Sequence, residues 1–150
     1  MLVVAMMSIM LACVFSTFAM TGLIWFVQIV HYPLFAAVGR DQFVAYEGRH
    51  TVLTTWVVMP LMMVELGSSI WLAVHPLSGW NGLLIAAAIL TVLIWLSTFF
   101  LQVPQHRILE RGFDEAAWRF LVNSNWVRTV LWTARSAILC WMLGSMPLVV

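Results

Sequence analysis

The sequence predicts an all-α integral membrane protein, a transmembrane antiparallel bundle of four helices. One observation is the presence of four long apolar stretches, at about residues 2–31, 51–75, 82–103 and 126–148. A run of about 20 apolar residues is what a helix needs to cross the hydrocarbon core of a bilayer. The other is composition, because 63% of the residues are hydrophobic, only 9% are charged and the mean hydropathy is +1.00. Four spans leave little chain for a soluble domain, so we expect a single membrane domain over residues 1–150.

Each stretch is bounded by signals that favour a membrane span. The first lacks a preceding basic residue and stays apolar as far as Val30, which favours a span over a cleaved secretion signal. A charged connection separates it from the second stretch. An uncharged turn around Pro76 and Trp80 leads to the third stretch, and a second charged connection leads to the fourth.

The arginines predict the orientation. All seven basic residues are arginines, and most lie in the first and third connections or at the start of the fourth span: Arg40, Arg49, Arg107, Arg111, Arg119 and Arg128. Positively charged connections stay in the cytoplasm. We therefore expect a multi-pass protein of the bacterial inner membrane with both termini on the periplasmic side.

Short words recur along the chain. Thr21, Leu23, Ile24 and Trp25 recur as Thr91, Leu93, Ile94 and Trp95, and Thr51, Val52, Leu53 and Thr55 recur as Thr129, Val130, Leu131 and Thr133. Two repeated helical hairpins would explain this pattern. Chance recurrence between apolar helices is the alternative.

Polar residues at helical spacing give each span one polar stripe, which in lipid should face the other helices. The stripes are Thr21, Trp25, Gln28 and Tyr32; His50, Thr54, Leu61, Glu65 and Ser68; Thr91, Trp95, Thr98, Gln102 and His106; and Asn125, Arg128, Trp132 and Arg135. The stripes predict a polar interior inside an apolar bundle.

Three histidines from three helices should meet at the cytoplasmic border, namely His31, His50 and His106. We interpret them as candidate metal ligands. Glu47 and His50 form a Glu-x-x-His pair, a spacing that bundle di-iron proteins use for adjacent ligands. Carboxylate and imidazole suit iron, manganese, zinc or copper, and two facing histidines suit haem. The alternative is that these polar residues only solvate and cap helix ends.

Further roles are predicted for Glu47, which neighbours His50, and for residues of the stripes. We assign Glu47 and Arg128 as candidate catalytic residues, since a carboxylate or an imidazole could act as general acid or base. Candidate cofactor-binding residues are Gln28, Tyr32, Gln102, Asn125 and Trp132.

Glu65 and Arg135 are the most deeply placed ionisable residues. Their depths differ by about 7 Å at 1.5 Å per residue, which an arginine side chain can span, so we expect an intramembrane ion pair. A proton or substrate anchor is the alternative. Cys13 and Cys140 lie in the first and last spans, where a disulfide or simple apolar packing are both open.

The chain resembles a family of uncharacterised small bacterial four-helix membrane proteins, and more distantly the anthrone-oxygenase-like membrane proteins. The resemblance covers nearly the whole chain and is carried by residues 21–33, His50, residues 60–65, Gln102, Pro104, His106, residues 125–129, Trp132 and Arg135. It implies the helical bundle. The distant similarity implies oxidation of a hydrophobic aromatic substrate, and no catalytic residue is matched.

Three functions stay open at this point. One is a metal- or cofactor-dependent oxidoreductase or oxygenase acting on a hydrophobic, quinone-like or aromatic molecule. The others are a non-enzymatic accessory subunit of a larger membrane complex and a small carrier, as a monomer or a homodimer, with Glu65 and Arg135 on its path. The lipid bilayer is the expected partner in each case, and no basic cluster indicates nucleic acid.

Overall fold

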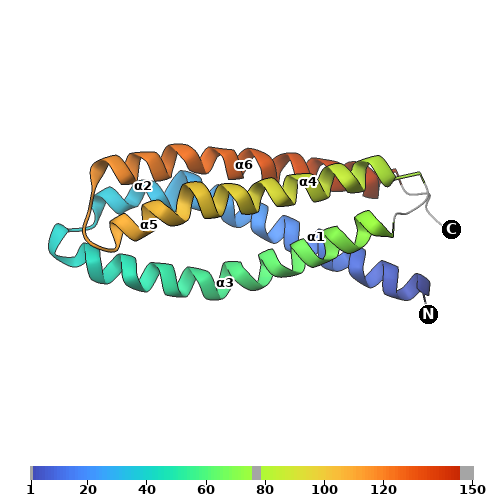
Figure 1. Ribbon diagram of the computed structural model, residues 1–150, viewed down its shortest axis with the longest axis horizontal. Helices are drawn as coiled ribbons and strands as arrows, with labels where there is room; N and C mark the ends of the chain where they lie inside the picture. The colour runs from blue at the N-terminus through green and yellow to red at the C-terminus, as the bar shows by residue number, and fades with distance from the viewer. Residues whose placement is uncertain (1, 76–78, 146–150) are drawn as a thin grey trace.

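The computed structural model describes residues 2–75 and 79–145 and is helical throughout (Figure 1). The all-helical prediction is confirmed, since the described residues contain no strand. The elements are α1 (Leu2–Phe26), η1 (Val27–His31), α2 (Tyr32–Leu34), η2 (Phe35–Ala37), α3 (Arg40–Val74), α4 (Asn81–Ser97), η3 (Thr98–Gln102), α5 (Val103–Leu109) and α6 (Glu115–Gly144). They form four continuous helical segments, of which the first is α1 to η2 and the third is α4 to α5.

Two of these segments contain one π-helical turn each, and each turn comes just before a proline. In η1 the backbone N–H of Tyr32 bonds to the carbonyl of Val27, five residues back, and Pro33 follows. In η3 the N–H of Val103 bonds in the same way to Thr98, and Pro104 follows. Proline has no N–H to donate and its ring crowds the carbonyl four residues back, so a wider turn relieves both problems.

The helices extend further into the charged connections than the apolar pattern predicts. α3 begins at Arg40 rather than near residue 51, and α6 begins at Glu115 rather than near residue 126. The N-cap of α6 is Asp114, whose carboxylate accepts the N–H of Ala117 at 2.8 Å. Charged residues in an amphipathic extension lower the mean hydropathy without breaking the helix, which is why the apolar pattern alone places these boundaries too late.

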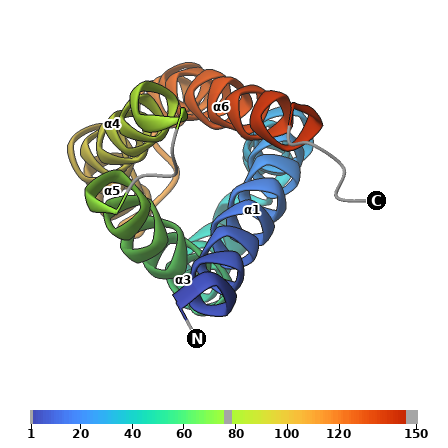
Figure 2. The same cartoon turned by 90° about the vertical axis from the view of Figure 1, so that its right-hand side faces the viewer.

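The four segments surround a common centre (Figure 2). α1 packs against α3 and α6, and α4 packs against the same two helices, so that α3 and α6 occupy opposite corners. Buried polar side chains share the inside of this ring with apolar ones such as Ile94 and Leu139, whereas many large apolar side chains lie exposed outside it, such as Phe15, Trp56 and Phe100. So apolar an outer surface is unusual for a water-soluble bundle and suits a lipid surround.

Among the described residues, three helical segments are long and apolar enough to cross a membrane: Val4–Ala37, Arg40–Val74 and Asn81–Leu109. α6 is not one of them, although a fourth span over about residues 126–148 was expected. It carries Arg128 and Arg135, both buried in the bundle, and these lower its apolar character. The last residues of the expected span, 146–148, lie outside the described part of the chain.

Candidate metal centre and cavity

A cluster of histidines lies at the end of the bundle where α2 leads to α3 and α5 leads to α6. Nε2 of His31 is 2.9 Å from Nδ1 of His50, and the rings of His50 and His106 are 5.4 Å apart between centroids. Three different helical segments thus bring their histidines to the same level. Hydroxyl groups complete the surroundings: Oγ1 of Thr54 is 3.0 Å from the same Nδ1 of His50, and the hydroxyl oxygen of Tyr32 is 3.0 Å from Nε2 of His106.

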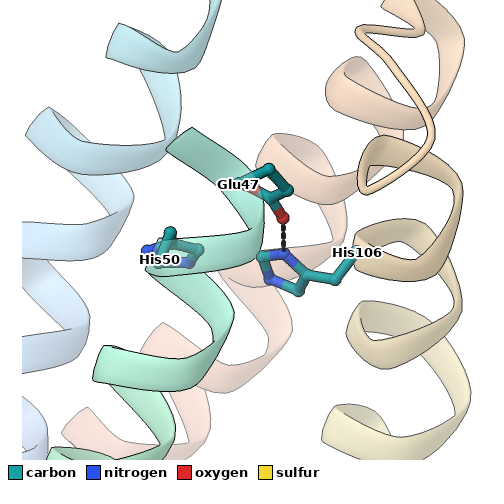
Figure 3. A group of neighbouring side chains, drawn as sticks. All are labelled: Glu47, His50 and His106. Carbon is teal, nitrogen blue, oxygen red and sulfur yellow. Dashed lines mark hydrogen bonds and ion pairs between the residues drawn. The ribbon is translucent and has the colours of Figure 1, made fainter. Parts of the chain in front are cut away.

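Among the described residues, Glu47, His50 and His106 form a group of side chains that could hold a metal ion (Figure 3). One ligand atom from each lies within 4.8 Å of the other two. The early start of α3 makes this possible, because Glu47 and His50 then share one helical face at i and i+3. His31 was expected as the third ligand. The structure instead places it behind His50, as the hydrogen-bond partner of that ring.

His106 sits between a carboxylate and a phenol. Its Nδ1 is 2.6 Å from Oε1 of Glu47, and its Nε2 is 3.0 Å from the hydroxyl oxygen of Tyr32. Nη2 of Arg128 donates to that hydroxyl at 3.2 Å. Since a guanidinium can only donate, the Tyr32 proton is free to point at Nε2 of His106, which leaves the ring proton on Nδ1 for Glu47. The residues form a directional relay from Tyr32 through His106 to Glu47.

Two atoms of the cluster have no hydrogen-bond partner among the described residues. Oε2 of Glu47 is fully buried and has no hydrogen-bond partner among the described residues. His50 uses Nδ1 for both of its hydrogen bonds, and none is found from its Nε2 within the same part of the chain. A buried carboxylate oxygen without a donor costs free energy, and a bound cation is one way to satisfy it.

Gln28 and Asn125 position Arg128 beside the cluster through hydrogen bonds. Nδ2 of Asn125 donates to Oε1 of Gln28 at 2.9 Å, and Oδ1 of Asn125 accepts from Nε of Arg128 at 2.9 Å. Gln28 in turn donates to the carbonyl of Val122. Neither amide lines the cavity beside the cluster, so the expectation that they bind a cofactor directly is wrong for the cavity described here. Their contacts hold Arg128 in place.

A cavity of about 310 Å³ adjoins the cluster. Its polar end contains Tyr32, His50, Gln102, His106 and Arg128. Apolar and aromatic side chains form much of the rest: Val58, Met59, Met62, Trp95, Phe99 and Val103. An apolar pocket with a few convergent polar groups is the usual form of a small-molecule site.

Sequence reasoning placed Gln102, Tyr32 and Arg128 near this cavity, but it also placed Trp132 there. Trp132 is completely buried and donates its indole N–H to the carboxylate of Glu65, at 3.2 and 3.1 Å from the two oxygens. The aromatic walls, Trp95 and Phe99, were not expected as ligand contacts. Their spacing of four residues beside the π-helical turn η3 is the signal that could have indicated them.

Glu65 and Arg135 form an ion pair of 3.0 Å across the centre of the ring, with no exposed surface on either side chain. Arg135 also donates to Oγ1 of Thr17 at 3.0 Å, to Oγ of Ser69 at 2.6 Å and to Sγ of Cys13 at 3.1 Å. Cys13 and Cys140 are both free thiols, so the alternative of a disulfide between them is wrong. One cysteine is buried beside Arg135 and the other is exposed.

The rings of His50 and His106 are 5.4 Å apart between centroids, with an angle of 33° between the ring planes. Ligation of a haem iron by two facing histidines stays a prediction.

The chain matches no known family model, and neither a curated protein nor a solved structure is significantly similar to it.

Proposed function

We propose that this protein is a membrane-embedded oxidoreductase or oxygenase that holds a transition-metal ion at Glu47, His50 and His106 and acts on a hydrophobic, quinone-like or aromatic molecule in the adjoining cavity. The observation that carries the proposal is Oε2 of Glu47, a fully buried carboxylate oxygen without a hydrogen-bond partner among the described residues. It belongs to a group whose ligand atoms lie within 4.8 Å of one another.

The donor set fits iron, manganese, zinc or copper, since one carboxylate and two imidazoles are common ligands of each. His106 would exchange its hydrogen bond to Glu47 for the ion, and His31 would orient His50 from behind through the 2.9 Å contact between their rings. A metal that changes oxidation state would exchange electrons with the substrate. Zinc would restrict the site to acid–base chemistry.

The protein's own residues would handle the proton. Tyr32 lines the cavity and contacts both His106 and Arg128, so it is the group best placed to give a proton to an oxygen atom of the bound substrate or to receive one from it. Arg128 would stabilise negative charge on that oxygen, because a guanidinium donates and never accepts. The apolar walls would exclude water from the reacting atoms.

The finer architecture belongs to the same proposal. We infer an antiparallel transmembrane bundle built from two repeated hairpins, and the two π-helical turns, each followed by Pro33 or Pro104, support the repeat. Six of the seven arginines lie toward the cluster end, which supports a cytoplasmic cluster and periplasmic termini in a bacterial inner membrane. Kinship with the small four-helix membrane proteins and the anthrone-oxygenase-like proteins would agree with this chemistry.

Metal content is the direct test. The native protein, the variants Glu47→Gln and His50→Ala, and the control His75→Ala are purified in mild detergent and analysed by mass spectrometry for metals and by visible absorption. His75 is a suitable control because it follows α3 at the far end from the cluster. We expect near-stoichiometric metal in the native and His75→Ala proteins and its loss in the other two. A native protein that contains none of iron, manganese and copper, and takes up none of them on reconstitution, would refute the proposal, and this includes a protein that binds zinc alone.

A further inference from the structure

Arg128 is a buried cation with no carboxylate beside it. The residue is only 7% exposed, and its guanidinium contacts Oδ1 of Asn125 and the hydroxyl of Tyr32. No acidic oxygen lies within 4 Å of it in the part of the chain that the structure describes. Asn125 and Tyr32 are both neutral acceptors. They satisfy hydrogen bonds of the Arg128 guanidinium but do not neutralise its positive charge.

The other buried arginine shows what a compensated charge looks like in this fold. Arg135 has no exposed surface and pairs with Glu65 at 3.0 Å. Glu47 has no direct contact with Arg128: Tyr32 and His106 lie between them in a chain of hydrogen bonds, and Oε1 of Glu47 accepts from His106. Glu110 is exposed at the cavity lining. A buried charge without a close counter-charge is costly, and an anion that enters the site would relieve that cost.

Arg128 can reach such an anion because it lines the cavity. Its Nε and Nη2 are used by Asn125 and Tyr32, and no hydrogen bond is found from Nη1 among the described residues. Gln102, the other strong polar group there, is already satisfied, because it accepts from Ser97 and donates to Ser124 at 3.1 Å each. Among the buried lining groups, the unused nitrogens are therefore Nη1 of Arg128 and Nε2 of His50, and only the first belongs to a permanent cation.

We propose that the cavity binds an organic anion, with one ionised oxygen group on Arg128 and an apolar, ring-sized body between Met59, Met62, Trp95 and Phe99. This inference rests on the proposed function only in taking the cavity as the substrate site, and it does not require a metal. A carboxylate and the enolate of an acidic hydroxyquinone share this chemistry. Charge-assisted hydrogen bonds to a buried guanidinium would select either of them over a neutral molecule of the same shape.

Two matched pairs of probes test the inference: 2-naphthoate against 2-naphthamide, and 2-hydroxy-1,4-naphthoquinone, which is ionised at neutral pH, against 1,4-naphthoquinone. Dissociation constants are measured by calorimetry in a non-ionic detergent. The protein is treated with a chelator first, so that ligation of a metal by the anion cannot produce the preference. We expect the native protein to bind the anion of at least one pair about tenfold more tightly, or better. The pair that responds distinguishes a carboxylate from an enolate.

Variants assign the preference to the residue. Arg128→Gln keeps hydrogen-bond donors and removes the charge, so the ratio of the two dissociation constants should fall to near one. Arg107→Gln is the matched control, because Arg107 also lines the cavity but is exposed, and water screens its charge. It should keep most of the preference.

Equal affinity of the native protein for both members of each pair would overturn the inference, as would a preference that survives in a folded Arg128→Gln protein. If that variant does not fold, Arg128→Met, which also removes the charge, serves in its place, and equal affinity of the native protein for both members of each pair overturns the inference by itself. The metal analysis is independent of these measurements. A metal-free protein that prefers the anions would refute the proposed redox function and leave this inference standing.

Discussion

Replacing Glu65 by glutamine should strongly destabilise the protein, although the change is nearly isosteric. Both Glu65 and Arg135 have no exposed surface, and the pair lies inside the ring between opposite helices. Glu65→Gln leaves the packing intact but removes the carboxylate charge that pairs with Arg135, and no other acidic side chain pairs with Arg135 within residues 2–75 and 79–145. Breaking a buried pair from one side costs about 3–5 kcal/mol, because the remaining charge stays buried.

The hydrogen bonds lost with the charge act in the same direction. Oε1 of Glu65 accepts from Thr17, Trp132 and Arg135, and Oε2 accepts from Trp132. A glutamine can offer one acceptor oxygen only, so its amide nitrogen would face a donor. We therefore expect the free energy of unfolding to fall by at least about 3 kcal/mol.

The assay is unfolding of the purified protein by increasing mole fractions of dodecyl sulfate in mixed micelles, followed by circular dichroism. The matched control is Glu115→Gln, which breaks the exposed pair between Glu115 and Arg119, with an N–O distance of 2.7 Å. Exposed pairs contribute about 0–1 kcal/mol, so this variant should behave almost like the native protein.

The double variant Glu65→Gln, Arg135→Met separates charge from packing. If an uncompensated cation causes the loss, removing that cation should restore a large part of the stability. The reasoning is refuted if Glu65→Gln is no more destabilising than Glu115→Gln. A double variant that is less stable than Glu65→Gln alone would show that the neighbouring hydrogen bonds, rather than charge, dominate.

Three further changes have defined outcomes. His31→Ala should weaken metal binding by about 10- to 100-fold, whereas His50→Ala should abolish it, because His31 only orients His50. Equilibrium dialysis with the metal measures both affinities, and equal losses in the two variants would contradict this assignment. Tyr32→Phe should leave metal content unchanged and lower turnover of any substrate found, since it removes the hydroxyl that contacts His106 and Arg128; unchanged turnover would exclude a proton-transfer role for Tyr32. Asp114→Ala should cost about 1 kcal/mol through loss of the N-cap of α6, seen as a lower melting temperature, and an unchanged melting temperature would show that the cap contributes nothing.

The sequence by itself determined the helical class and the level of the main polar groups. Apolar runs of this length have one way to satisfy their backbone in lipid, and depth along a helix follows directly from residue number at a fixed rise. For this reason counting residues was enough to place His31, His50 and His106 at one end and to bring Glu65 opposite Arg135.

Only the tertiary structure decided which side chains at one level meet. Partners such as Glu47 and His106 are 59 residues apart, and their contact depends on how each helix is rotated about its own axis. Each π-helical turn adds one residue to a turn of the helix and so changes the direction in which all later side chains point. A stripe drawn with a period of 3.6 residues therefore fails across η1 and η3. The packing of the segments brings His106 beside Glu47, places His31 behind His50, and turns Trp132 toward Glu65. Depth is a property of each helix alone, whereas rotation is settled by the packing of all four segments together.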